Sequence, residues 1–250
     1  MLKDKNYVLT IDIGGSKTEI CYFNKSLSCL ASKILPTSAI KRQGYLNLRL
    51  LADVLQPHLK YQKIGLAIKG IVFNGNLLSS SLLGNANRKD ILLGIKKLFG
   101  SGVTLINDVE AMAMAEKKFG IGKNESDFVL LNLGTGVRII CVYDGKYQIG
   151  AHGVAGEISH LPMIEYNAQA PIESFINQIA YLLLNISAFY DPIVIVLNGG
   201  VIQNKKLLLP KIIAKYKSIL PPQTKPAKVV ISGLKHAACL GAALATRRSN

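Results

Sequence analysis

The sequence predicts an α/β protein of two domains, each with a mixed sheet flanked by helices, and a cleft between the domains. Strand-like and helix-like segments alternate along the 250 residues, which is typical of α/β layering. A strand, a glycine turn and a second strand open the chain at 7–24, and the same pattern returns at 127–150. Apolar residues make up 49% of the chain, which favours packed cores over disorder.

The repeated opening predicts two related domains. We place the first at 1–115 and the second at 116–236. The last helix, predicted at 237–249, is expected to pack back on the first domain. A chain of this length has room for two domains of modest size.

The first half of the chain begins with a predicted hairpin. Apolar, β-rich residues at 7–13 and 19–24 flank Gly14 and Gly15, which we expect at the hairpin tip. In the next segment, 46–59, apolar residues recur at helical spacing and so share one face of a helix. The elements predicted there are a helix at 46–59, a strand with a glycine break at 64–72, a helix at 87–100, a strand at 103–107 and a helix at 108–120.

The second half repeats this alternation. It starts with a strand, a glycine turn, a strand, a turn and a strand over 127–150. A fully apolar strand ending in two glycines follows later, with Pro210 expected to break or start a helix. The other predicted elements are a helix at 170–190, the strand at 192–201, a helix at 206–220, a strand at 227–234 and the last helix.

Charge and hydropathy limit the function classes. The net charge is +15, but the basic residues are scattered in ones and twos, which favours a solvated basic surface over nucleic-acid binding. No apolar run approaches the roughly 18 residues of a membrane helix, and 179–190 is expected to be a buried helix. Without a signal-peptide pattern at the start, we expect a cytoplasmic protein with no membrane partner.

The four cysteines are Cys21, Cys29, Cys141 and Cys239. They stand far apart in the sequence and form no C-x-x-C pair. We therefore expect buried free thiols rather than disulfides or a metal site.

The two glycine turns are candidates for binding an anion. Glycines let backbone N–H groups approach phosphate closely, and nearby hydroxyls add donors. Neither turn is a P-loop, and neither leads from a strand into a helix as a dinucleotide fingerprint does. A plain hairpin explains the stretch DIGGSKT as well as a phosphate site does.

Asp108 and the Glu157–His160 pair are candidates for chemistry. Asp108 ends a strand and begins a helix, so it could cap the helix or accept a hydroxyl proton during phosphoryl transfer. Glu157 and His160 are three residues apart in a glycine-rich loop, a pair that suits sugar hydroxyls but also an ordinary polar loop. Small residues in CLGAALA fit a close helix contact as well as a ligand.

Taken together, these pieces resemble the ROK family of sugar kinases, within the actin-like and hexokinase-like ATPase superfamily. The resemblance runs over nearly the whole chain, through the stretches IDIGGSKTEI, INDVEAMAMAE, LNLGTG, GAHGVAGEISH, LNGGV and CLGAALA. It implies two actin-like (ribonuclease H-like) domains. It also implies transfer of phosphate from ATP, with Mg²⁺, to a hexose-type sugar.

The resemblance also implies roles for individual residues. Asp108 resembles the catalytic base, and Asp12 resembles the acid that orients Mg²⁺ through water. The expected sugar-binding residues are Asn107, Glu157, His160, Glu173 and Gly70. The expected nucleotide and phosphate contacts, besides Asp12, are Gly14, Gly15, Thr18, Gly134, Thr135, Gly136, Gly199 and Gly200.

The chain departs from the family pattern in two places that bear on function. Residues 161–175 contain no cysteine, so we expect no zinc site in the segment where most members carry one. The second phosphate turn continues as GTGVRII, and Arg138 could contact phosphate or obstruct the nucleotide.

Several activities stay open within this reading. The first is a glucose kinase acting on the 6-hydroxyl; the stretch KGIVFNGNLL also looks like N-acetylmannosamine kinases. A kinase of another N-acetylhexosamine, a polyphosphate-using glucokinase and a sugar-binding relative without turnover are the remaining candidates. The family's repressors carry a winged helix before the first strand, which here starts by Tyr7, so we expect an enzyme. Members commonly dimerise, so a homodimer is a candidate assembly.

Overall fold

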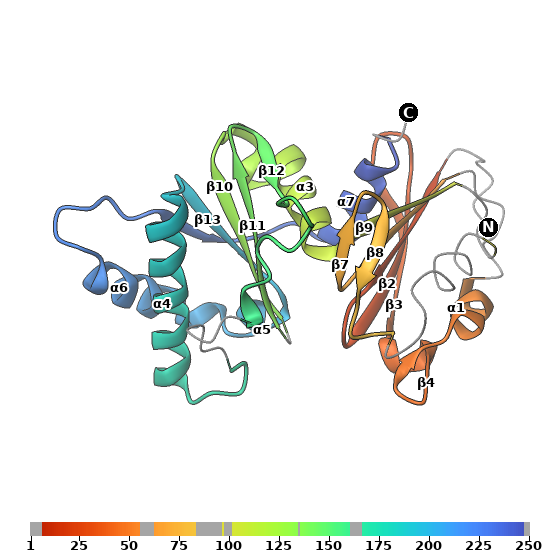
Figure 1. Ribbon diagram of the computed structural model, residues 1–250, viewed down its shortest axis with the longest axis horizontal. Helices are drawn as coiled ribbons and strands as arrows, with labels where there is room; N and C mark the ends of the chain where they lie inside the picture. Colours follow the sequence, from red (N-terminus) through yellow and green to blue (C-terminus); the bar gives the residue numbers. More distant parts are fainter. Residues whose placement is uncertain are drawn as a thin grey trace. The chain divides into compact units, whose positions relative to one another are not determined.

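The computed structural model describes residues 7–55, 63–83, 97, 102–134, 136–160 and 167–247. The chain divides into two compact units, the first formed by Met1–Ala115 with Lys235–Asn250 and the second by Glu116–Leu234. Each unit contains a five-stranded mixed sheet with helices packed on it (Figure 1).

The sheet of the first unit has the strand order β3-β2-β1-β6-β9. Its first three strands are antiparallel and the last two run parallel to β1. The hairpin and the two later strands confirm the sequence prediction. The bounds are β1 Val8–Ile13, β2 Lys17–Phe23, β3 Cys29–Pro36, β6 Ile64–Ile68 and β9 Val103–Asn107.

The edge strand β3 was missed by the sequence analysis. Seven of its eight residues are exposed, including the apolar Leu30 and Ile34, and its sequence shows no alternation of apolar and polar residues that would mark a half-buried strand. An edge strand is held in the sheet by backbone hydrogen bonds to its neighbour, so its side chains need not form a buried face.

Smaller elements complete the first unit. They are η1 Thr37–Ile40, β4 Lys41–Arg42, β5 Tyr45–Leu46, α1 Leu48–Leu55, β7 Ile71–Phe73, β8 Asn76–Ser79 and α7 Ala237–Ala245. Helix α3, Asp108–Phe119, begins in the first unit and continues into the second after Ala115. The predicted strand at 64–72 is thus two strands, because β7 leaves the main sheet and pairs with β8. The helix predicted at 87–100 lies outside the described residues, apart from Lys97.

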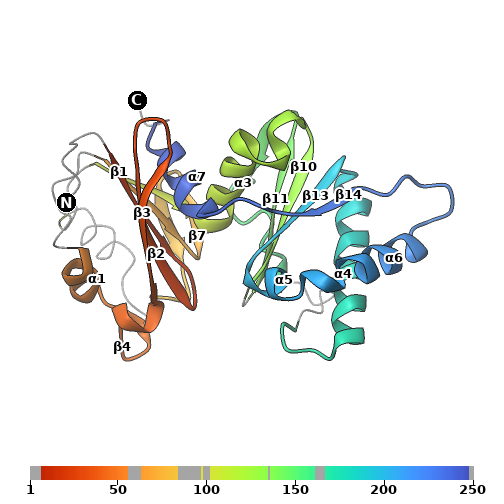
Figure 2. The same ribbon diagram turned by 180° about the vertical axis from the view of Figure 1, so that it is seen from behind.

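Alternation along β1 separates the two faces of the first sheet. Leu9, Ile11 and Ile13 are fully buried in one apolar cluster, so Thr10 and Asp12 belong to the opposite face. Helix α7 contacts β1, β6, β2 and β9 (Figure 2), and its residues lie outside that cluster, so it covers the Thr10–Asp12 face. This face therefore carries Thr10 and Asp12, beneath α7.

The second sheet repeats the arrangement of the first, with the order β12-β11-β10-β13-β14. An antiparallel hairpin of β10 and β11 is again followed by strands parallel to its first member. The bounds are η3 Ile121–Asn124, β10 Phe128–Leu133, β11 Val137–Tyr143, β12 Lys146–Gln148, η4 Ile158–His160, α4 Ile172–Tyr190, β13 Val194–Asn198, α5 Gly200–Asn204, η5 Lys206–Leu208, α6 Leu209–Ile219 and β14 Lys228–Ile231. Pro210 lies in the first turn of α6 and so starts that helix.

Helix α4 packs one face into the core of the second unit, where it lies against α6. Phe175, Ile179, Leu183 and Ile186 are buried there. By length and composition alone, α4 is long and apolar enough to cross a membrane, which the sequence analysis did not anticipate. A helix packed in a protein core can have the same length and composition, and the sequence analysis expected residues 179–190 to form a buried helix.

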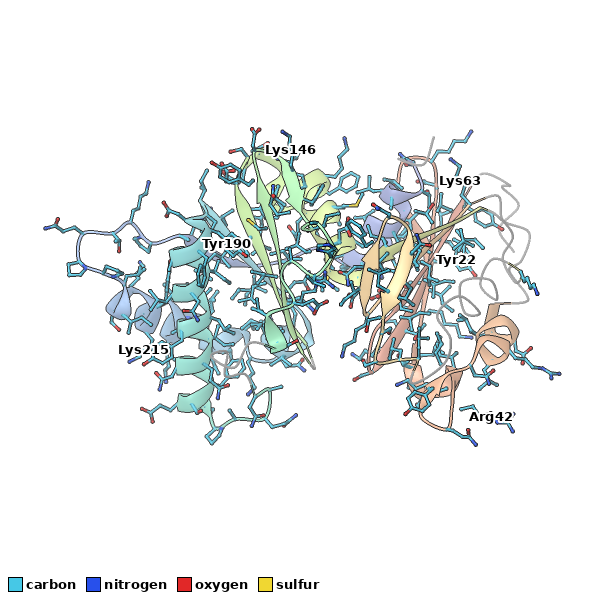
Figure 3. All side chains as sticks on the ribbon, in the orientation of Figure 1. Tyr22, Arg42, Lys63, Lys146, Tyr190 and Lys215 are labelled. Carbon is cyan, nitrogen blue, oxygen red and sulfur yellow. The ribbon has the colours of Figure 1, made fainter. Side chains whose placement is uncertain are left out.

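In the sequence of both units the basic residues occur mostly singly or in pairs, without a long basic run. Arg42 in the first unit and Lys146 in the second are exposed and point outward (Figure 3). Nζ of Lys146 lies 3.7 Å from Oδ2 of Asp144, and both side chains are 78% exposed. An ion pair this exposed contributes little to stability.

Candidate active site

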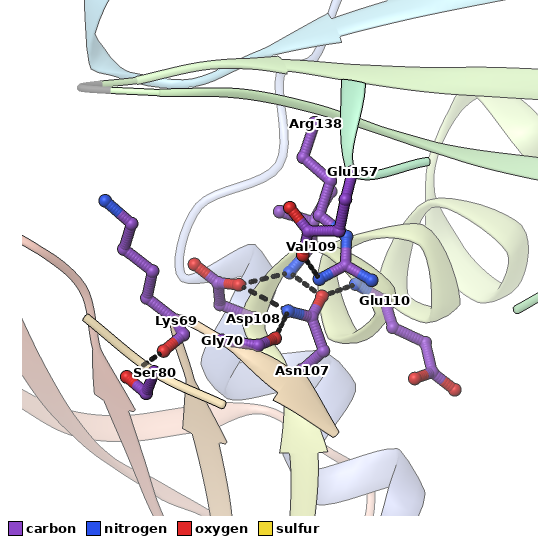
Figure 4. Close-up of polar contacts among 9 residues, drawn as sticks. All are labelled: Lys69, Gly70, Ser80, Asn107, Asp108, Val109, Glu110, Arg138 and Glu157. Carbon is purple, nitrogen blue, oxygen red and sulfur yellow. Dashed lines mark hydrogen bonds and ion pairs between the residues drawn. The ribbon is translucent and has the colours of Figure 1, made fainter. Parts of the chain in front are cut away.

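The junction between β9 and α3 holds the candidate base. Asn107 is the last residue of β9 and is 1% exposed, and Asp108 is the first residue of α3. Oδ1 of Asp108 accepts hydrogen bonds from Nδ2 of Asn107 and from the backbone N–H of Val109, both at 3.0 Å (Figure 4). These two bonds fix the carboxylate at a helix N-terminus, where the helix dipole favours its negative charge.

Asn107 supplies two of the bonds that cap the helix, and Asp108 adds the one described above. Oδ1 of Asn107 accepts the backbone N–H groups of Val109 and Glu110, each at 2.9 Å. Its Nδ2 donates to the backbone oxygen of Gly70 at 2.7 Å and to Asp108. The two amide hydrogens and the carbonyl oxygen are thus all used within the protein, which favours a positioning role for Asn107 over direct contact with a ligand.

Gly70 supports Asn107 through its backbone. Its φ of +149° and its surroundings both require glycine, since a Cβ there would lie 2.2 Å from the backbone oxygen of Ser79. The neighbouring Lys69 accepts a hydrogen bond from Oγ of Ser80 at 2.6 Å through its backbone oxygen. Residues 69 and 70 therefore tie β7 and β8 to the start of α3.

Asp12 lies near the carboxyl end of β1, opposite Glu19 in the hairpin register. Its Oδ1 is buried and has no hydrogen-bond partner within the described part of the chain. Burial, followed by the charges of Asp108 and Glu19, raises the pKa of Asp12 well above its ordinary value. A hard divalent cation would stabilise such a carboxylate, so Asp12 fits the Mg²⁺-orienting role.

The first glycine turn is held from inside the protein. The backbone N–H of Gly14 donates to the oxygen of Lys17 at 3.0 Å, which closes the hairpin. Thr18 is buried, and its hydroxyl lies 3.0 Å from that of Thr37, which in turn donates to the oxygen of Gly14 at 2.9 Å. Thr18 thus shapes the turn from beneath, whereas Ser16 is exposed at its tip.

The second glycine turn leaves space around its backbone. The N–H of Gly134 donates to the oxygen of Gly136 at 3.0 Å, and a Cβ at Gly136 would meet nothing within 4 Å. Thr135 lies outside the described residues. The internal bond closes the turn, and the open space beside Gly136 leaves room for a ligand to approach the backbone.

The turn after β13 combines one required glycine with one open position. Gly199 has a φ of +103°, and a Cβ there would lie 2.3 Å from the backbone oxygen of Leu133. Gly200 has nothing within 4 Å of an added Cβ. The β13 turn thus packs tightly on the end of β10 and leaves room on its other side.

Two asparagines beside these turns were missed by the sequence analysis. Asn132 and Asn198 are paired in the parallel register of β10 and β13. Oδ1 of Asn132 and Nδ2 of Asn198 are buried without a hydrogen-bond partner among the described residues. Polar residues at matching positions in two apolar strands were the available signal.

Arg138 forms an ion pair with Glu157. Nη1 of Arg138 lies 2.5 Å from Oε1 of Glu157, and the two side chains are 9% and 22% exposed (Figure 4). The structure therefore gives Arg138 a carboxylate partner from the 150–160 loop, a contact that the sequence analysis did not consider. At this burial the pair is shielded from solvent and is expected to hold Glu157 in one orientation.

His160 and Glu173 are the remaining candidate sugar contacts. His160 ends η4, but its side chain lies outside the described residues. Glu173 is exposed in the first turn of α4. Residues 161–166, part of the segment that lacks cysteine, are also outside the described part of the chain.

Comparison with known proteins yields a family and a fold. The model of the family described as ROK matches residues 8–170 and 164–248. The N-acetylmannosamine kinase of Salmonella arizonae is 30% identical over 154 residues, which make up 61% of this chain and 53% of that relative. The chain thus spans about half the length of the curated relatives that it matches.

Solved structures share the architecture over nearly the whole chain. The ROK family glucokinase from Streptomyces griseus, in complex with glucose and AMPPNP, matches with a TM-score of 0.83 and 16% identity, covering 98% of this chain and 100% of that chain. The inorganic polyphosphate/ATP-glucomannokinase from Arthrobacter sp. strain KM matches with a TM-score of 0.75 and 19% identity, covering 98% and 100%. At these identities the likeness concerns the fold, and it confirms the predicted α/β class with two mixed sheets flanked by helices.

Proposed function

This chain belongs to the ROK family, and on that premise we propose that it is an ATP-dependent sugar kinase. In this proposal the γ-phosphate of ATP is transferred to a hydroxyl of a hexose-type sugar, with the 6-hydroxyl expected from the sequence. The observation that carries the proposal is the Asn107–Asp108 junction. There a carboxylate is held in fixed orientation at the carboxyl end of a parallel strand, where ligands of α/β proteins collect.

Asp108 acts as the general base. Its carboxylate takes the proton of the sugar hydroxyl while that oxygen forms a bond to the γ-phosphorus and the bond from phosphorus to the bridging oxygen of ADP breaks. Asn107 keeps the carboxylate in place through its Nδ2. We therefore assign Asn107 a positioning role, supported by the full use of its amide group within the protein.

The glycine turns take the phosphates and the nucleotide. The turns formed by Gly14 and Gly15 and by Gly134, Thr135 and Gly136 are expected to line the phosphates, and Gly199 and Gly200 the adenosine side. The N–H groups of Gly14 and Gly134 close their own turns, so the phosphate donors are expected among the other backbone N–H groups. The open space at Gly136 and Gly200 supports these roles. Asp12 would hold Mg²⁺ through water, and the bound ion would neutralise charge on the phosphates.

Glu157, His160 and Glu173 are the proposed sugar contacts, with the backbone of Gly70. The ion pair with Arg138 supports the role of Glu157, because a carboxylate held in one orientation can select particular hydroxyl positions. The pairing also argues that Arg138 serves the sugar side rather than obstructing the second phosphate turn.

Two sugars are the first to be tested. N-acetylmannosamine is favoured by one specific observation, the name of the relatives with 30% identity. Glucose is the first candidate from the sequence, which also offered N-acetylmannosamine through the stretch KGIVFNGNLL. We expect the reaction to take place in the cytoplasm without a membrane or nucleic-acid partner, and a homodimer is the candidate assembly.

The proposal is tested by ADP release over a panel of hexoses and N-acetylhexosamines. We expect turnover with at least one sugar and a loss of kcat of roughly 10²–10⁴-fold in Asp108→Asn, the contribution typical of a general base. Asp53→Asn, the same change at an exposed residue of α1, should leave kcat unaltered.

Two results would count against the proposal. Full activity in Asp108→Asn would remove Asp108 as the base. Sugar binding by calorimetry without turnover from any donor would favour a sugar-binding protein that lacks catalysis.

A further inference from the structure

We propose that the first unit contains a binding site for a thiophilic divalent cation such as Zn²⁺, with Glu19, Cys21 and Cys239 as its ligands. One carboxylate oxygen and two Sγ atoms of these residues all lie within 4.8 Å of one another. The site is distinct from the phosphate turns and from the cysteine-free segment after His160. None of its three ligands has a role in the proposed kinase reaction, although Glu19 lies opposite Asp12 in the β1–β2 register.

The fold brings these ligands together from the two ends of the chain. Glu19 and Cys21 are two residues apart on β2, so their side chains share one face of the sheet. Helix α7 contacts β2, and Cys239 lies in its first turn. Sγ of Cys239 is 3.6 Å from the backbone oxygen of Glu19, which places the thiol directly over that strand.

The spacing suits tetrahedral zinc. Zinc binds thiolate at about 2.3 Å and carboxylate oxygen at about 2.0–2.2 Å, so its ligand atoms stand roughly 3–4 Å apart. Ligand atoms already within 4.8 Å need only small rotamer adjustments to reach this geometry. Two sulfur ligands favour zinc over Mg²⁺ or Ca²⁺, which prefer oxygen. Three protein ligands leave the fourth position to water.

His236 positions the carboxylate ligand. Its Nδ1 lies 2.7 Å from Oε1 of Glu19, and both side chains are partly buried. Partners of this kind orient metal ligands from outside the coordination sphere. Asp12, opposite Glu19 in the register, adds a second carboxylate to this face. A bound cation would offset that accumulation of negative charge.

The experiment is a Co²⁺ titration of the reduced, metal-free full chain, followed by displacement with Zn²⁺. We expect one Co²⁺ per chain, a thiolate-to-cobalt charge-transfer band and the strong visible bands of tetrahedral cobalt. Both signals should disappear in Cys21→Ala and in Cys239→Ala. Cys141→Ala is the matched control, because Cys141 is a buried free thiol of the second unit, and it should bind as the wild type does.

Further variants test which neighbouring groups take part in the site. His236→Gln should keep the bands but weaken Co²⁺ binding by roughly 10–100-fold, as loss of an orienting partner does. Cys29→Ala should keep both signals, since Cys29 is exposed and is not one of the three residues whose ligand atoms lie within 4.8 Å of one another. Cys21→Ser and Cys239→Ser, which preserve side-chain size, replace the alanine variants if those fail to fold by circular dichroism.

Several outcomes would overturn the proposal. One is a wild-type protein with reduced thiols and no thiolate–cobalt band. Another is a band that persists in both Cys21 and Cys239 variants, or that is lost equally in Cys141→Ala. A band that requires Cys21 and Cys29 but not Cys239 would assign the metal to the sheet edge instead.

Discussion

At the scale of single residues, the roles of Asn107 and Asp108 at the start of α3 depend on the side-chain amide of Asn107. The sequence left Asp108 with two possible roles, helix cap or base. The structure gives two capping bonds to Asn107, which accepts from Val109 and Glu110. The carboxylate of Asp108 is held by the amide of the same residue, and it adds one further capping bond by accepting the N–H of Val109.

Asp12 is predicted to lower the stability of the ligand-free protein. A carboxyl group with a raised pKa is less stable in its charged form in the fold than in the unfolded chain. Its destabilising effect is absent below the unfolded pKa of about 3.9 and grows as pH rises through the folded pKa. Asp12→Asn should therefore raise the melting temperature near neutral pH, by about 2 °C or more, and the gain should vanish towards about pH 4.

The same variant should lose Mg²⁺-dependent turnover, because an amide is a poor partner for the ion. Thermal unfolding across pH and steady-state kinetics measure the two effects, with Asp53→Asn as the control. A lower melting temperature together with unchanged turnover would show that Asp12 has a structural role instead.

At the scale of elements, small residues in α7 allow close packing. A Cβ on Gly241 would lie 1.7 Å from the backbone oxygen of Ala111 in α3, and one on Gly65 of β6 would lie 2.6 Å from that of Ala242. The stretch CLGAALA is therefore explained by helix and strand contacts within the first unit. From the sequence alone, a bound ligand explained these small residues as well as a close helix contact did.

Gly241→Ala should destabilise the protein by about 3 kcal/mol, because the contact between α7 and α3 must open. The melting temperature should fall by roughly 5–10 °C. Because α3 begins with Asp108, kcat should fall as well. Gly233→Ala is the control, since a Cβ there meets nothing within 4 Å, and its melting temperature should stay within about 2 °C of the wild type. Equal stability of the two variants would contradict the packing explanation.

At the scale of the whole molecule, the net charge of +15 raises the question of the phosphoryl donor. A polyanion such as polyphosphate would be attracted to a basic surface. The basic residues are scattered along the chain, however, without the continuous block that a long polyanion would follow.

We therefore predict that ATP is the better donor. Phosphorylation of the sugar from polyphosphate should be at least about tenfold slower than from ATP, and raising the salt concentration should affect ATP turnover little, since its contacts are local. Sugar-phosphate formation with both donors, at low and high salt, measures this. Polyphosphate activity that equals the ATP activity and falls steeply with salt would contradict the prediction.

Local order was predictable from the sequence because it depends on neighbours along the chain. Apolar, β-rich segments on either side of glycine turns predicted both hairpins, and helical spacing of apolar residues predicted the helix that contains α1. The edge strand β3 escaped because its residues are mostly exposed and carry no alternation. The candidate site residues were found through motifs of short spacing, such as Asn107–Asp108 and the glycine turns.

Only the tertiary structure decided how these residues are partnered. The bond from Asn107 to Gly70, the pair of Arg138 with Glu157 and the approach of Cys239 to Cys21 join residues 37, 19 and more than 200 positions apart in the chain. The sequence by itself determined the repeated strand–turn–strand pattern, the helices and the residue types available for chemistry. Their hydrogen bonds, charges and burial depend on contacts that form when distant strands pair and helices pack, and no local pattern in the chain encodes them.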